Sequence, residues 1–162
     1  MKSTLPVYAS WPERLLAYLI DVLIVALLIA VPTQPFVHPG ETAWTVMVDP
    51  PAYAIIFLVN LLYQSYFIAS QSQATLGMRM LSLYVIRIDG RRLKARDSIE
   101  RFLAFFMPTL AGYTSFIPDP HATMVVFWLK LIWFTPILFR PDCAGLHDRL
   151  SSTMVLARTG GR

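Results

Sequence analysis

Asp21 is the residue of this chain whose type and position point most directly to chemistry. It is a carboxylate inside the first long apolar run, which covers residues 14–31. A carboxylate placed in hydrocarbon costs at least about 2.5 kcal/mol on insertion scales, so such residues usually face a polar partner or a water-filled cavity. A group of this kind can bind a cation or exchange a proton.

Few other polar side chains lie deep enough in apolar runs to meet Asp21. Arg14 precedes it by two helical turns on the same face, at about 10 Å. Asn60 and Gln64 are spaced four residues apart and share one face of the second run, with Gln64 at about the depth of Asp21, and Lys130 falls near the middle of the last run.

Two interpretations of these residues remain open. In the first, Asp21 is an ion- or proton-binding carboxylate in a polar pocket with Gln64, Asn60 and Lys130. In the second, Asp21 only helps helices to pack, by hydrogen bonding or by pairing with Arg14 or Lys130.

The composition predicts the elements that must position these residues. Of the 162 residues 56% are hydrophobic and only 15% are charged, whereas soluble domains carry about 25% charged residues. We therefore expect an all-α membrane protein, one unit over residues 1–162, with transmembrane helices at about 14–31, 52–70, 102–117 and 122–139.

The distribution of basic residues predicts the orientation. Half of the fourteen lysines and arginines lie in segment 71–101 and four lie from residue 140 onward, whereas connections 32–51 and 118–121 contain none. By the positive-inside rule we expect both termini, segment 71–101 and tail 140–162 on the cytoplasmic side of a bacterial inner membrane. The basic residues follow membrane boundaries, so membrane lipids and not nucleic acid are the expected partners.

Segment 71–101 carries the pattern of a β-hairpin. Residues 81–88 are rich in β-branched and aromatic side chains, Asp89 and Gly90 form a strong turn signal, and residues 91–94 follow. The prediction is a short cytoplasmic β-hairpin between the second and third helices.

Three motifs in order resemble the RDD family of small multi-pass membrane proteins, which is named for one arginine and two aspartates. They occur as the helix-entering Arg14-Leu-Leu-Ala-Tyr-Leu-Ile-Asp21, the Thr-x-Gly of a middle segment with a second helix-entering arginine, and a closing Asp with a threonine. The matching residues of this chain are Arg14, Asp21, Thr75, Gly77, Arg101, Asp148 and Thr153. Family members commonly have lysine where this chain has Met78.

The resemblance implies a role in the transport of unknown ligands, which has been suggested for the family, and some members are reported as sodium/proton antiporters. The leading hypothesis is therefore cation- or proton-coupled transport of Na⁺ or K⁺ against H⁺, with Asp21 titrating. Since four helices enclose little space, we expect a homo-oligomer. For Asp148 we favour a structural ion pair with an arginine at the inner boundary: Arg14, Arg101 or Arg79.

The alternative hypothesis belongs to a different class of function. In it the chain is a non-transporting accessory protein that binds a partner protein or anionic lipid. Its basic face would then contain Arg91, Arg92 and Lys94. Enzyme activity, a cofactor and a metal site are not expected. The single cysteine and three histidines split between the two sides offer no shared ligand set, and no nucleophile motif accompanies His147 and Asp148.

Overall fold

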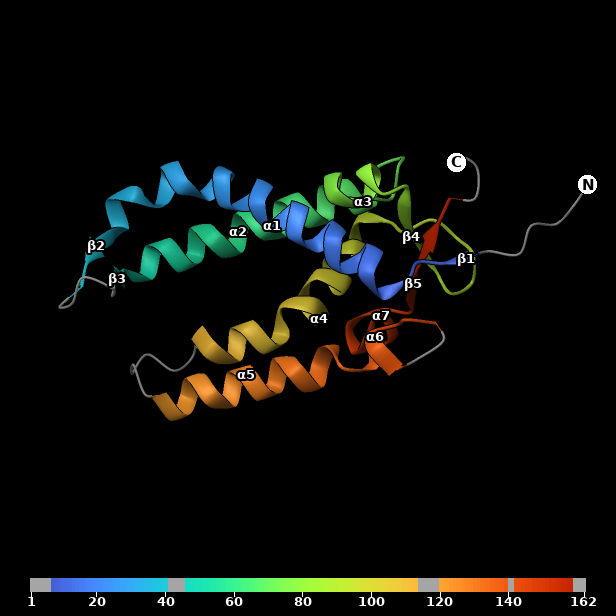
Figure 1. The fold of residues 1–162 in the computed structure, drawn as a ribbon. Coiled ribbons are helices and arrows are strands. Elements are labelled where there is room, and N and C mark those ends of the chain that lie inside the picture. The colour runs from blue at the N-terminus through green and yellow to red at the C-terminus, as the bar shows by residue number, and fades with distance from the viewer. Residues whose placement is uncertain (1–6, 41–45, 114–119, 140–141, 159–162) are drawn as a thin grey trace, which may run out of the picture.

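The fold is a bundle of long helices with a small sheet at one end (Figure 1). The computed structural model describes residues 7–40, 46–113, 120–139 and 142–158. Its long helices are α1 (Trp11–Thr33), α2 (Pro50–Ala69), α4 (Ala95–Tyr113) and α5 (Pro120–Phe134). Helix α1 packs beside α2, α2 packs against α4, and α4 packs beside α5, so the bundle consists of two hairpin-like pairs.

The helix boundaries follow from local chemistry. The carboxylate of Glu13 accepts hydrogen bonds from the backbone N–H (3.0 Å) and the hydroxyl (2.8 Å) of Ser10, at the start of α1. Helix α2 starts with two prolines, whose missing N–H groups cost nothing in a first turn. Helix α5 ends before Pro136, which cannot donate to the preceding turn, and the chain continues as the short α6 (Pro136–Phe139).

Within the described residues, two helices are long and apolar enough to cross a membrane. They are α1 with the following 3-10 turn η1 (Gln34–Phe36), and α2. Their outward faces are strongly apolar: Leu27 on α1 is 76% exposed and Leu62 on α2 is 67% exposed. Such faces are typical of contact with lipid. The third predicted span begins earlier than expected, at Ala95, and its residues 114–117 lie outside the described residues.

The strand predicted after the second helix is present, but its predicted partner is wrong. Strand β4 (Leu83–Arg87) pairs antiparallel with β5 (Thr153–Ala157) from the tail, and β1 (Val7–Tyr8) pairs with the other edge of β5. A separate ribbon joins β2 (Val37–Pro39) to β3 (Val46–Val48), so the fold is not purely helical.

Residues 91–94 do not form the returning strand of a hairpin. The Asp89–Gly90 turn does form, with Gly90 at φ +80°. Beyond it Leu93 is buried in the core, and the carboxylate of Asp97 accepts a hydrogen bond from the backbone N–H of Lys94 at 2.8 Å. The carbonyl of Arg91 still accepts the backbone N–H of Arg87 at 3.0 Å, after which the chain passes into α4, and β4 pairs with β5 instead.

A small core joins the sheet to the adjacent helix ends. Its members come from the start of α1, the end of α2, the sheet and the segment before α4: Ala9, Ala17, Ile68, Leu83, Val85, Leu93 and Val155. Two short helices complete this end, α3 (Leu76–Met80) packed on α1, and α7 (Leu146–Leu150) packed on α4. Both charged motifs are located here.

Candidate functional site

Asp21 is the centre of a buried hydrogen-bond cluster that joins three helices. Its side chain accepts hydrogen bonds from the Tyr63 hydroxyl (2.6 Å), the Thr75 hydroxyl (2.6 Å) and the backbone N–H of Gly77 (2.8 Å). Tyr63 belongs to α2, whereas Thr75 and Gly77 belong to the start of α3. One carboxylate of α1 thus connects both following helices.

The Thr-x-Gly motif serves this contact. Thr75 precedes α3, and its Oγ1 also accepts the N–H of Met78 at 3.3 Å, so the same hydroxyl caps the short helix. Gly77 approaches α1 so closely that a Cβ built on it would lie 2.2 Å from the carbonyl oxygen of Ala17. Only glycine leaves room for the Asp21 hydrogen bond.

Of the two α2 residues predicted to meet Asp21, Gln64 lies in the same cavity and Asn60 bonds its own helix. Asn60 donates to the carbonyl of Ile56 in its own helix at 2.8 Å, so its amide serves α2 itself. Gln64 lines the same cavity as Asp21. The α2 residue that binds Asp21 is instead Tyr63. Its long side chain extends to Asp21 from the adjacent face of α2. The sequence argument considered only membrane depth and helix face, so it did not identify Tyr63.

Asp148 forms the second buried cluster. Both Arg14 from α1 and Arg101 from α4 donate to its carboxylate, which is fully buried. The backbone N–H of Gly145 donates to it as well, at 3.1 Å. Arg101 also donates to the hydroxyl of Thr153 in β5. The cluster therefore ties the tail to α1 and α4.

The third arginine considered for Asp148 has other partners. Arg79 donates to the carbonyl of Ala74 (3.1 Å) and to the hydroxyl of Ser70 (3.1 Å), and its guanidinium lies over the ring of Phe67. These contacts hold the turn between α2 and α3 at the end of the bundle.

The Asp148 cluster carries more positive than negative charge. Burial alone would raise the pKa of Asp148, but the charges of Arg101 and Arg14 outweigh burial and hold the pKa well below its usual value. Asp148 is therefore ionised at physiological pH. One carboxylate then faces two guanidinium groups, and one positive charge stays uncompensated within the cluster.

His147 packs beside this cluster as a neutral ring. It is 3% exposed and contacts the rings of Phe105 and Phe134. Burial lowers the pKa of His147 from 6.5 to about 4; the charge of Asp148 opposes this shift, and Arg101 and Arg14 add to it. Among the described residues its Nδ1 has no hydrogen-bond partner.

This histidine predicts an acid-sensitive fold. The unfolded chain takes up the His147 proton near pH 6.5 and the folded chain only near pH 4, so the folded state is favoured above pH 6.5 and loses about 3 kcal/mol as the pH falls to 4. A His147→Phe variant should lose less over this range. Chemical unfolding in detergent at a series of pH values measures the difference, and parallel curves for the two proteins would refute the assignment.

A cavity of about 540 Å³ lies between α1, α4 and α5 and reaches both clusters. The charged residues of its described wall are Arg14, Asp21, Arg101 and Lys130, and Tyr18 and His147 are titratable. Most of the remaining wall is aromatic or aliphatic. The volume falls in the range usual for small-molecule sites, about 300–1,000 Å³.

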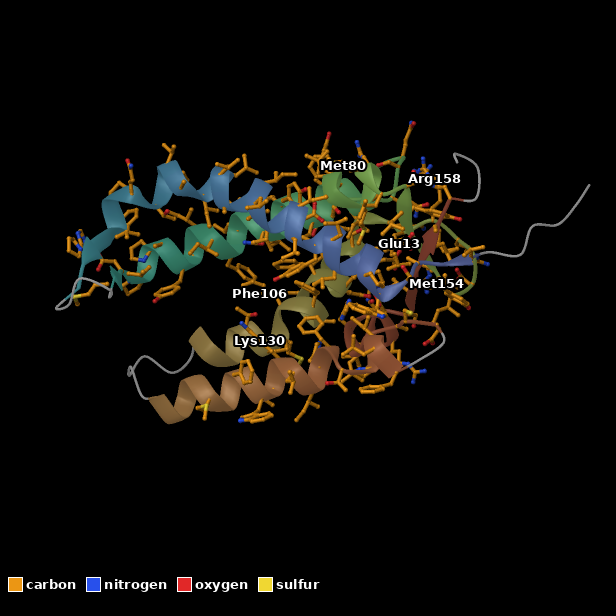
Figure 2. The ribbon with its side chains drawn as sticks, in the orientation of Figure 1. Glu13, Met80, Phe106, Lys130, Met154 and Arg158 are labelled. Carbon is orange, nitrogen blue, oxygen red and sulfur yellow. The ribbon has the colours of Figure 1, made fainter. Side chains whose placement is uncertain are left out.

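Lys130 lies in the cavity wall. Figure 2 places it on the side of α5 that is turned toward α4. Within the described part of the chain no salt bridge joins Lys130 to Asp21 or to another carboxylate, although such a pair was one of the sequence alternatives. Its ammonium group is thus available to the cavity.

The described part of the chain is mostly helical, and two of its helices are long and apolar enough to cross a membrane, as in a small helical membrane protein. The sequence model of the RDD family matches residues 8–152, and the chain belongs to this family. It is 26% identical over 152 residues to the "Uncharacterized protein YxaI" of Bacillus subtilis (strain 168), covering 93% of this chain and 87% of that protein. No solved structure matches the chain.

Proposed function

We propose that this protein crosses the bacterial cell membrane four times, with both termini in the cytoplasm, and that it is a proton-linked transporter. The topology is supported by the two hairpin-like helix pairs and by the position of β1 and β5, which lie together at one end of the bundle. The basic segment that contains β4 lies at that same end, as the positive-inside rule requires of a cytoplasmic face.

The observation that carries the transport proposal is the position of Asp21, which lines the cavity wall. Among the described wall residues it is the one carboxylate beside three cationic side chains. Intramembrane carboxylates that face a cavity commonly mark ion or proton paths. Asp21 is therefore the group assigned to gain and lose the proton.

The hydrogen bonds of Asp21 link its protonation to helix packing. Tyr63 and Gly77 donate to Oδ1, and Thr75 donates to Oδ2. A proton on Oδ2 turns this oxygen into a donor, so the Thr75 hydroxyl has to reorient. Since Thr75 also caps α3, protonation changes the contact between α1 and α3.

The charge of the cavity bears on which ion is exchanged. Arg14, Arg101 and Lys130 outnumber Asp21 in the wall, so a Na⁺ or K⁺ ion next to Asp21 would meet net positive charge. Direct cation binding in this cavity is the part of the antiport hypothesis that the geometry supports least. A proton avoids this repulsion because it neutralises the carboxylate covalently.

An Asp21→Asn variant should fold and lose proton-coupled flux. Asparagine keeps one oxygen for Gly77 and Tyr63 but cannot titrate. The measurement is proton movement into proteoliposomes with a trapped pH dye, under imposed Na⁺, K⁺ or anion gradients. Asp89→Asn is the matched control, because Asp89 lies in the exposed turn before α4 and outside the cavity. Wild-type flux from a folded Asp21→Asn protein would disprove the mechanism.

A second candidate function is an accessory role at the basic face, and the exposure of its arginines favours it. The side chain of Arg91 is 83% exposed and that of Arg96 is 89% exposed. Charge reversal at Arg91, Arg92 and Lys94 should abolish binding to vesicles containing phosphatidylglycerol if this face holds anionic lipid. Unchanged vesicle binding would remove this candidate. Whether the chain acts as a homo-oligomer is tested by cross-linking in the same vesicles.

A further inference from the structure

The cavity between α1, α4 and α5 combines an apolar wall with an excess of positive charge. Its apolar side chains include the aromatic rings of Tyr18, Phe102, Phe105 and Phe134 and the aliphatic chains of Leu15 and Leu138. The cationic residues come from all three helices. A site of this composition favours a ligand with one apolar part and one charged end.

The net charge of the residues around the cavity favours an anionic ligand. Arg14, Arg101 and Lys130 carry three positive charges, whereas the adjacent carboxylates Asp21 and Asp148 carry two negative charges. A buried charge without a partner is costly, because the low dielectric of an apolar site replaces its hydration. One negative charge brought by a ligand would balance the group.

The cations also have donors left for such a ligand. Arg101 makes its hydrogen bonds to Asp148 and Thr153 from Nη1, and within the described residues Nη2 and Nε have none. Lys130 has no ion pair in the described part of the chain. Guanidinium and ammonium groups bind carboxylate and phosphate oxygens through charge-assisted hydrogen bonds.

The outer wall of the cavity indicates where the apolar part of the ligand lies. Leu15, Leu131 and Leu138 line the cavity and are themselves about half exposed on the bundle surface. In a membrane this surface would meet acyl chains. A volume of about 540 Å³ suits a single chain and is small for a whole two-chain phospholipid.

We infer that this cavity binds a single-chain amphipathic anion, with its carboxylate or phosphate at Lys130 and Arg101 and its chain along the wall of α5. The inference rests on the proposed function, since it names the solute that moves with the proton. The ligand is a free fatty acid or a single-chain lysolipid of the membrane. Both present an anionic end and one acyl chain to the cavity.

The test is equilibrium binding to protein in nanodiscs of zwitterionic phosphatidylcholine, with empty nanodiscs subtracted. The probes are dodecanoate, lysophosphatidic acid and the uncharged dodecanol. Dodecanoate or lysophosphatidic acid should bind with saturation, and dodecanol should bind at least about tenfold more weakly because it offers no charge-assisted contact. Preference for one of the two anions identifies the source. Equal binding of dodecanol would overturn the inference.

Lys130→Gln provides the variant, because Lys130 lies outside the Asp148 cluster and its loss leaves that ion network intact. Affinity for the anion should fall about tenfold. Lys94→Gln is the control and should bind like the wild type, since Lys94 is exposed before α4 and does not line the cavity. Wild-type affinity in Lys130→Gln would also overturn the inference.

The measurements of anion binding and proton flux distinguish a failure of this inference from a failure of the proposed function. Saturable anion binding without proton flux would uphold the anion site and overturn proton-linked transport. Proton flux that depends on Asp21, without anion binding, would uphold transport and overturn the anion site.

Discussion

Replacing Gly77 by alanine is expected to prevent folding. The added Cβ would lie 2.2 Å from the backbone carbonyl oxygen of Ala17 and 3.0 Å from Cγ and Oδ1 of Asp21. No side-chain rotation relieves the first contact, so α1 and α3 would have to separate. Separation would break the hydrogen bond from the Gly77 N–H to Asp21. We expect a loss of more than about 4 kcal/mol and little folded protein.

Gly90→Ala is the matched control for this prediction. Gly90 has φ +80° in the turn before α4, and a Cβ built on it meets nothing within 4 Å. In this variant only the left-handed backbone lowers the stability, by about 1–2 kcal/mol. Yield of monodisperse protein and thermal unfolding in detergent compare the two. If Gly77→Ala is as stable as Gly90→Ala, then α3 does not pack on α1 as described.

Replacing Asp148 by asparagine is expected to destabilise the protein by about 3–5 kcal/mol. The carboxylate is the shared acceptor of Arg14 and Arg101; Asp148 and Arg101 are buried, and the side chain of Arg14 is only 9% exposed. Without its charge two guanidinium groups face each other in an apolar environment. Because Asp148 also ties the tail to α1 and α4, β5 should become accessible to protease.

Arg14→Met is the informative comparison for Asp148. It removes one of the two guanidinium groups and leaves Asp148 paired with Arg101, so the remaining pair is charge-balanced. The loss from Arg14→Met should be at most about half of the loss from Asp148→Asn. Chemical unfolding in detergent at neutral pH gives both values. Equal losses would contradict the excess positive charge on which the anion site depends.

The three residues of the family name act mainly as connectors in this fold. Asp21 connects α1 to α2 and α3, whereas Arg14 and Asp148 connect α1 and α4 to the tail. Both clusters lie at the end of the bundle that carries the sheet. For Asp148 the structural ion pair considered from the sequence is what the geometry contains, with Arg14 and Arg101 sharing the role.

Some features were predictable from the sequence because they depend on local composition and periodicity. The apolar runs around Asp21 and Gln64 predicted α1 and α2, and the β-branched run after Met80 predicted β4. The depth of Asp21 in an apolar segment showed that it requires polar partners. The structure places the motif residues Thr75 and Gly77 on Asp21, and it places Arg101 between Asp148 and Thr153.

Only the tertiary structure determined which strands pair and which side chains contact each other. The partner of β4 is β5, some seventy residues later, because burial of Leu93 and the capping of α4 by Asp97 commit residues 91–94 to another path. Tyr63 rather than Asn60 binds Asp21, because its hydroxyl reaches the carboxylate while the Asn60 amide bonds its own helix. Spacing along one helix determines which face a residue occupies, but pairings between segments depend on how those faces pack in three dimensions.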